Sequence, residues 1–229
     1  MLKKLLCATL LAAGIGAAHA ADPGFYVGGG IGQARYDDSL TGQIRSAYTN
    51  DPGYAFVSGR LTDDTDNAWK LFGGYRFLPW LGVEFAWVDF GQVDSHYVLH
   101  SQVPLTNADA TIDGRYEIAG PSATVFGELD FNQRTSGILR VGAYNAQVDY
   151  SETGTGADGQ PHRFSNSGSN TKLTYGLGLN VRVTPSWDVR LDWDRYTDAG
   201  RRFALTNDGN GRFDHIDFVS LNLAYRFGQ

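Results

Sequence analysis

The C-terminal end of the chain alternates between apolar and polar positions. Every second residue from Val219 to Phe227 is apolar or aromatic, and the residues between them are small or polar. Side chains of a β-strand point alternately to its two faces, so a period of two residues indicates a strand with one apolar and one polar face. The pattern predicts a final strand over residues 216–227 that ends in aromatic side chains.

Seven earlier segments repeat this alternation, with apolar residues on one face and glycine or polar residues on the other. The pattern is weakest in the fourth segment, because Gly120-Pro121 interrupts its start and proline cannot donate a ladder hydrogen bond. The chain is therefore predicted to be all-β. The predicted strands cover 25–36, 68–77, 81–90, 122–131, 137–150, 172–183, 187–195 and 216–227.

The connections between these segments alternate in length. Three are tight turns, at 78–80, 132–136 and 184–186, and four are long and polar, at 37–66, 91–118, 151–170 and 197–214. Short turns on one rim and long loops on the other are typical of outer-membrane barrels. We therefore predict an eight-stranded antiparallel up-and-down transmembrane β-barrel of the bacterial outer membrane, with the long loops outside the cell.

The distribution of charge supports this prediction. After the N-terminal segment, the chain has no run of 18 apolar residues, which excludes a transmembrane helix. The apolar strand faces carry no charge until the outer rim, where a lipid-facing cation no longer costs the roughly 2–4 kcal/mol that it costs at mid-bilayer. Aromatic residues are expected to form a girdle at each rim.

The first twenty residues have the pattern of a secretory signal peptide. Lys3 and Lys4 precede an apolar stretch over 5–18, and Ala18-His19-Ala20 is a cleavage motif. The predicted organisation is a cleaved signal peptide over 1–20 and a single barrel domain over 21–229. The only cysteine, Cys7, lies in the signal, so the mature chain is expected to have no disulfide and no cysteine metal site.

The overall charge argues against nucleic acid as a partner. The formal net charge is −6, and removal of the two signal lysines leaves −8, so there is no basic excess. No cofactor or metal site is predicted, since the acidic and glycine-rich stretches do not match the spacing of a Ca²⁺ loop or a nucleotide loop.

Six short motifs in order resemble the transmembrane domain of the outer membrane protein A (OmpA) family, over nearly the whole mature chain. The resemblance implies an abundant eight-stranded barrel with roles in envelope integrity, surface adhesion and a small pore activity. The motifs are Phe25-Tyr-Val-Gly, Phe72-Gly-Gly-Tyr75, Gly82-Val-Glu-Phe85, Val183-Thr-Pro185, Arg190-Leu-Asp192 and Tyr225-Arg-Phe-Gly-Gln229.

The chain departs from that family in two ways. Many members carry a periplasmic peptidoglycan-binding domain after the barrel, and none is expected here because the sequence stops at Gln229. The family also has a luminal quartet of two acids and two bases that is implicated in gating. Glu84 and Arg190 match one acid and one base, whereas Glu128 and Asn180 occupy the other base and acid positions, so the second pair is not reproduced.

Charged side chains gather on the predicted lumen faces. Buried unpaired charges cost several kcal/mol each, so we expect these groups to form an ion-pair network. Two interpretations stay open: a packed polar plug, which the narrow interior of an eight-stranded barrel favours, or a narrow ion route gated by pairs that exchange partners. The candidates are Lys70, Arg76, Glu84, Glu128, Arg140, Arg182, Arg190, Asp192 and Arg226, with Lys172, Asp130, Asp188 and Asp194 on the same faces.

A lipid-A-modifying enzyme is the main alternative class. Its candidates are His96 beside Ser95, His100 beside Ser101, and His215 near Asp217. Adjacent strand residues point to opposite faces, so these serine–histidine neighbours are poorly placed to form a dyad. We therefore expect no catalytic site.

Two arginines at the outer rim are candidates for lipid contact. Arg35 and Arg195 continue the lipid-facing register there, where a guanidinium group can bind lipopolysaccharide phosphate. The predicted partners are outer-membrane lipid, lipopolysaccharide and, through the C-terminal strand, the barrel-assembly machinery. The barrel is expected to be a monomer with a structural and surface-interaction role, and the loops carry no motif that identifies a partner.

Overall fold

The computed structural model describes residues 23–49, 51–102, 108–199 and 213–228. The predicted signal peptide over 1–20 and most of the connection over 197–214 lie outside these residues. Among the described residues, no helix combines the length and apolar character that a membrane span requires. The elements are β1 (Gly24–Tyr36), α1 (Ser39–Tyr48), β2 (Tyr54–Leu61), β3 (Thr65–Leu78), β4 (Leu81–Ser101), β5 (Asp109–Asp130), β6 (Thr135–Thr155), β7 (Pro161–Arg182), β8 (Trp187–Ala199) and β9 (Phe213–Arg226).

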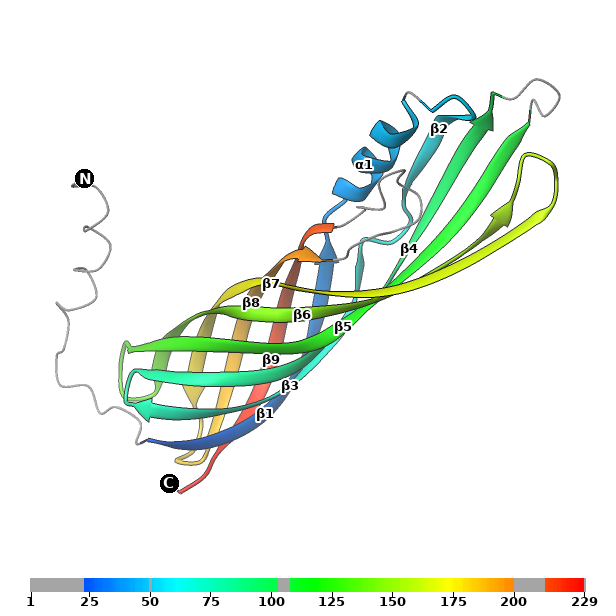
Figure 1. The fold of residues 1–229 in the computed structure, drawn as a ribbon. Helices are drawn as coiled ribbons and strands as arrows, with labels where there is room; N and C mark the ends of the chain where they lie inside the picture. Colours follow the sequence, from blue (N-terminus) through cyan, green and yellow to red (C-terminus); the bar gives the residue numbers. More distant parts are fainter. Residues whose placement is uncertain (1–22, 50, 103–107, 200–212, 229) are drawn as a thin grey trace, which may run out of the picture.

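Eight of these strands close into an antiparallel barrel. The order is β1-β3-β4-β5-β6-β7-β8-β9, and β9 pairs with β1 to complete the ring. The predicted eight-stranded barrel is therefore confirmed. β1 begins and β9 ends at the same end of the barrel, where the turns are short; we call this the short-turn end and the opposite one the long-connection end (Figure 1). β2 lies outside the ring, and within the described ranges β4 is its only partner strand.

The predicted connections at the long-connection end were wrong in part, because they contain regular structure. β4 and β5 pair out to His100 and Asp109, well beyond the predicted strand ends at 90 and 122. β6 and β7 pair out to Thr155 and Pro161. The first long connection contains α1 and β2. These strands extend beyond the ring as a sheet with the order β2-β4-β5-β6-β7 (Figure 1).

The outward face of the ring is an apolar belt. Leu71, Leu139 and Leu221, on three different strands, are each more than half exposed. Soluble monomers rarely expose contiguous apolar surface beyond a few hundred Å², so a belt around the ring fits contact with lipid hydrocarbon. At the short-turn end the outward aromatics contact one another, as in Trp187–Tyr225 with ring centroids 5.0 Å apart.

The interior at the long-connection end is filled by an aromatic cap. The helix α1 buries Leu40 and Ile44 completely against it. Its rings meet in stacked and edge-on pairs, such as Tyr116–Tyr150 at 4.6 Å and Phe90–Tyr196 at 4.7 Å. Burial raises the pKa of Tyr97 to about 12, so this phenol stays neutral within the cap. The cap comprises Tyr36, Phe90, Tyr97, Tyr116, Tyr144, Tyr150, Tyr196, Phe213 and Phe218, with Leu40 and Ile44.

Replacing Leu40 should loosen the cap while the ring stays closed. Leu40→Ala removes a fully buried side chain, and such changes cost about 2–5 kcal/mol. We expect faster hydrogen exchange over α1 and the outer part of β4, with exchange unchanged in the halves of β1 and β9 that lie toward the short-turn end, away from the cap. Ser46→Ala, on the exposed side of the same helix, is the control. Equal exchange in both variants would mean that α1 does not hold the cap.

Candidate functional site

Six charged side chains meet in the barrel interior. All are nearly fully buried, and three bases face three acids. The interior of an eight-stranded barrel is just wide enough for its own side chains, so groups from different walls come into contact. The members of this central cluster are Lys70, Glu84, Arg140, Arg190, Asp192 and Asp194.

Two bases reach across the lumen to the same pair of acids. Lys70 Nζ on β3 donates to Asp192 Oδ2 and to Asp194 Oδ2 on β8, at 2.9 Å each. Arg140 on β6 donates to Asp192 Oδ1 at 2.7 Å and to Asp194 Oδ1 at 3.2 Å. These shared carboxylates connect three strands that do not neighbour one another in the ring.

Arg190 connects the remaining acid to this group. It donates through Nη1 to Glu84 Oε2 at 2.7 Å and through Nη2 to Asp192 Oδ2 at 3.0 Å. The Tyr26 hydroxyl also donates to Glu84 Oε2, at 2.9 Å. Arg190 Cζ lies 4.6 Å from the centre of the Phe72 ring, within the range of cation–π attraction. Every charge of the central cluster therefore has an opposite charge beside it.

The local sequence of β8 and β7 makes room for the cluster. Arg190, Asp192 and Asp194 are two residues apart, so all three point inward. Gly178 and Gly176 on β7 lie opposite the two aspartates. A Cβ atom would lie 2.1 Å from Asp194 Oδ1 at Gly176 and 2.5 Å from Asp192 Oδ1 at Gly178, so only glycine leaves space for the carboxylates.

A second group of charges lies toward the short-turn end. Arg76 donates a hydrogen bond to Glu128. Arg226 Nε lies 3.1 Å from Asp188 Oδ2, and its Nη2 donates to the Pro185 carbonyl oxygen at 3.0 Å. Arg182, in register with Asp188 across the β7–β8 ladder, has no acid within 4 Å among the described residues. We call Arg76, Glu128, Arg182, Asp188 and Arg226 the short-turn cluster.

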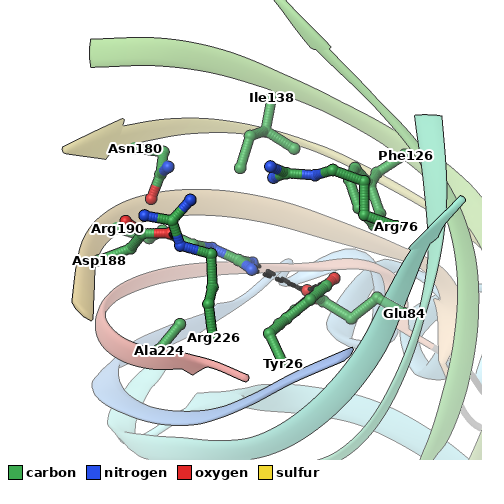
Figure 2. A pocket seen from close by; sticks show the side chains of 10 residues that line it. All are labelled: Tyr26, Arg76, Glu84, Phe126, Ile138, Asn180, Asp188, Arg190, Ala224 and Arg226. Atoms are coloured by element: carbon green, nitrogen blue, oxygen red, sulfur yellow. Dashed lines mark hydrogen bonds and ion pairs between the residues drawn. The ribbon is translucent and has the colours of Figure 1, made fainter. Parts of the chain in front are cut away.

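A small cavity separates the two clusters. Its volume is about 20 Å³, and Figure 2 draws the ten side chains that line it. The guanidinium groups of Arg76 and Arg226 point toward its middle from different walls (Figure 2). Arg190 and Glu84 close it on the side of the central cluster, and Asn180 lines it from β7. One water molecule needs about 10–15 Å³, so the cavity holds one or two particles of that size.

The structure divides the predicted lumen residues between these groups. The central cluster contains five of them: Lys70, Glu84, Arg140, Arg190 and Asp192. The short-turn cluster contains the other four, which are Arg76, Glu128, Arg182 and Arg226. Of the quartet positions of the OmpA family, Glu84 and Arg190 form an ion pair.

The other two quartet positions form only a weak contact. Asn180 Nδ2 lies 3.5 Å from Glu128 Oε1, an amide–carboxylate contact where the family has an ion pair.

Two neutral members of the network escaped the sequence analysis. Tyr26 holds Glu84, and Asn222 Nδ2 donates to Asp192 Oδ2 at 3.0 Å. The alternation of apolar and polar positions in β1 and β9 places Tyr26 and Asn222 on the lumen face, so this pattern could have identified them. Charge alone was not a sufficient criterion, because buried carboxylates also recruit neutral donors.

The two rim arginines differ in their surroundings. Arg195 donates through Nε and Nη2 to both oxygens of Asp217, at 2.6 Å each, and its Cζ lies 5.4 Å from the Trp193 ring centre. Arg35 lies on the other side of Asp217 in the strand register. Its side chain is 75% exposed, with Asp64 3.6 Å away. Arg35 is therefore the more available of the two for an external anion.

The histidine candidates pair with acids. His96 Nδ1 lies 2.6 Å from Asp113 Oδ1, and His215 Nε2 lies 3.8 Å from Asp217 Oδ2. His100 Nδ1 lies 2.7 Å from an oxygen of Asp109. Ser95 is buried under the sheet whereas His96 is exposed on its outer face, so these neighbours lie on opposite faces and form no dyad.

Comparison with known proteins gives a family match over nearly the whole chain. The model described as "Outer membrane protein beta-barrel domain" matches residues 5–227. Outer membrane protein P5 of Haemophilus influenzae is 25% identical over 234 residues, which cover 98% of this chain and 59% of that protein. The chain thus spans about three fifths of the length of the curated relatives it matches.

Two solved structures are also similar. Ail, the attachment invasion locus protein of Yersinia pestis, crystallised with the heparin analogue sucrose octasulfate, is 17% identical with a TM-score of 0.48 and covers 90% of this chain and 99% of its own. The outer membrane protein OprG from Pseudomonas aeruginosa is 14% identical with a TM-score of 0.49, and the match covers 93% of this chain and 99% of OprG.

Breaking the Glu84–Arg190 pair from one side should destabilise the barrel more than removing both charges. Glu84→Gln leaves Arg190 with a surplus buried charge, and such changes cost about 3–5 kcal/mol. We expect Glu84→Gln combined with Arg190→Met to recover part of this loss in denaturant unfolding from lipid vesicles. The exposed Arg134→Gln is the control. A double variant as unstable as the sum of the single ones would show that the two groups are not coupled.

Proposed function

The chain belongs to the family of outer membrane protein β-barrel domains, and from this premise we propose that it is a structural and interactive component of the cell envelope. In this proposal the barrel anchors a folded sheet on the cell surface, and its interior is sealed. By the general rule for such barrels, the short-turn end faces the periplasm and the long-connection end faces outward.

The observation that carries the proposal is the filled interior. The aromatic cap occupies the outer end, and the central cluster occupies the level beneath it with each charge paired. An ion crossing this path would have to leave water to enter an apolar layer, which is how hydrophobic constrictions block conduction. This arrangement supports the packed plug over the narrow channel.

The sheet beyond the ring supports the surface role. Strands β4 to β7 each run from the ring into the outer sheet, so the same pairs of strands hold the barrel wall and the outer sheet. Its outward face carries exposed polar groups such as His96, Arg115 and Asp113. Binding residues on such extensions are positioned by a rigid scaffold, so this sheet is the expected site of partner recognition.

Lipopolysaccharide is the lipid partner in this proposal, with Arg35 as the contact residue. Arg195 is already bound to Asp217 through two hydrogen bonds, so its role is to hold the rim. The barrel-assembly machinery is the expected partner of the closing strand β9 during insertion. A ring whose lipid-facing residues are uncharged throughout the belt suits a monomer.

Conductance measurements in a planar bilayer distinguish a sealed barrel from a channel. We expect the refolded wild-type protein to give no discrete current steps, and the same for Glu84→Ala and Arg190→Ala, because the aromatic cap stays closed in all three. A conducting porin in the same membrane is the positive control, and circular dichroism confirms folding. Discrete steps that change in size or gating with either substitution would establish the channel function instead.

Replacing Arg35 should weaken binding to lipopolysaccharide. A basic side chain near an anionic lipid surface contributes about 1 kcal/mol, so Arg35→Gln should lower the affinity about fivefold at low salt. Arg195→Gln should act mainly on stability, because it leaves Asp217 without its bidentate partner. Arg134→Gln, at the opposite end, is the control for net charge. Unchanged binding after replacement of both rim arginines would remove them from the interaction.

A further inference from the structure

The buried acids of this protein differ in the kind of base that they pair with. Those in the barrel lumen pair with lysine or arginine side chains, as Glu84 does with Arg190. Glu152, on the outer part of β6, is as deeply buried, with 4% of its surface exposed. Its only ion-pair partner in the described part of the chain is His162 of β7, whose Nε2 lies 2.8 Å from Glu152 Oε1. Since histidine loses its charge near neutral pH, this buried acid has a cationic partner only part of the time.

Glu152 also connects the far end of the outer sheet to the aromatic cap. The Tyr150 hydroxyl donates to its second oxygen, Oε2. The Tyr150 ring stacks on the ring of Tyr116 with the centroids 4.6 Å apart. On its other side lies Phe164 of β7, at 6.5 Å, which packs against the cap. One oxygen of this carboxylate is therefore bound to the cap and the other to β7.

The position of His162 makes this pair both accessible and mechanically important. The imidazole side chain is 51% exposed, so it exchanges protons with water. In the backbone ladder His162 lies opposite Gly154, two residues from Glu152, so the ion pair crosses diagonally from β7 to β6. Within the described ranges the ladder between β7 and β8 begins only at Thr174, which leaves β6 as the partner strand of the outer part of β7 (Figure 1). A side-chain tie to β6 therefore adds to the single ladder that holds this part of β7.

The other titratable groups around Glu152 keep their protonation state near neutral pH. They are phenols: Tyr150 beside it on β6, Tyr116 on β5 and Tyr48 on α1. Burial raises the pKa of each of these phenols above its usual value, so all three stay neutral. Histidine side chains ordinarily titrate at about pH 6.5, so the group of this set that changes its charge there is the imidazole.

We propose that Glu152 and His162 form a pH-sensitive latch on the outer sheet. In acid solution the protonated imidazole attracts the buried carboxylate and holds the outer end of β7 on the aromatic cap. As the pH rises, the imidazole becomes neutral, the ion pair is lost, and the end of the β6–β7 pair loosens. The barrel does not respond, because its buried acids pair with arginine and lysine. The latch depends neither on lipopolysaccharide binding nor on conduction.

Hydrogen exchange of the refolded protein in lipid vesicles at pH 5.5 and pH 7.5 tests the latch. The readout is the protection factor, which corrects for the intrinsic pH dependence of amide exchange. In wild-type protein, protection over 150–155 and 161–166 should be about fivefold higher at pH 5.5, as for a partly exposed ion pair that contributes about 1 kcal/mol. Protection in the halves of β1 and β9 toward the short-turn end should be equal at both pH values, which also confirms that the ring is closed.

Two substitutions of the histidine separate its charge from its shape. His162→Gln removes the titrating group, so protection of the outer β6–β7 segments should be low at both pH values. His162→Lys carries a positive charge at both, so protection should be high at both. His96→Gln is the matched control, because it removes a histidine from an exposed pair with Asp113 on the same sheet and should keep the wild-type response.

Three outcomes would overturn the latch. The first is equal protection of the outer β6–β7 segments at both pH values in wild-type protein. The second is an undiminished pH response in His162→Gln or in His162→Lys. The third is loss of the response in His96→Gln, which would assign the pH dependence to the exposed face of the sheet instead.

Discussion

The rule that every backbone N–H and C=O group in hydrocarbon must be paired governs this molecule. The ladder between β1 and β9, from Tyr26↔Arg226 to Tyr36↔Ile216, meets that rule by removing the last free edges of the ring. Closure with eight strands leaves a narrow interior, and the interior must then be filled by the alternate side chains that point inward. The charged clusters, the glycines opposite them and the aromatic cap all follow from this restriction.

The lumen meets the restriction in two different ways along its length. Toward the short-turn end, charges are buried and neutralised by one another, with Lys70 and Arg140 sharing the carboxylates of Asp192 and Asp194. Toward the long-connection end, aromatic rings and aliphatic side chains replace them, and Leu40 of α1 packs against these rings. A polar layer specifies which groups must meet, since unpaired charges are costly there, whereas the apolar layer excludes water.

The sequence predicted the part of the fold that the membrane imposes. The two-residue alternation located all eight ring strands, because lipid on one side and a polar lumen on the other leave a strong contrast between faces. That contrast is weaker beyond the membrane: in the outer part of β4 the polar Ser95 is buried, and the apolar Val98 lies on the partly exposed face. The alternation along each strand predicted which charged residues face the lumen. It did not predict which of them pair, because the pairing depends on how the strands are staggered relative to one another. That Arg182 has no acid within 4 Å among the described residues likewise follows from the three-dimensional placement of the strands.

The continuity of β5 has a mechanical consequence. This strand has 22 residues and so a contour length of about 70 Å, more than twice the roughly 30 Å of the hydrocarbon core. Its ladders with β4 and β6 continue on both sides of a short irregular stretch, where β4 carries a register shift between Asp89 and Gln92 and where Gly120 and Pro121 have no partner on β6. A pull on the outer sheet would load many hydrogen bonds in shear at once. A force applied to the outer sheet at the cell surface would therefore be carried along these strands into the wall of the barrel.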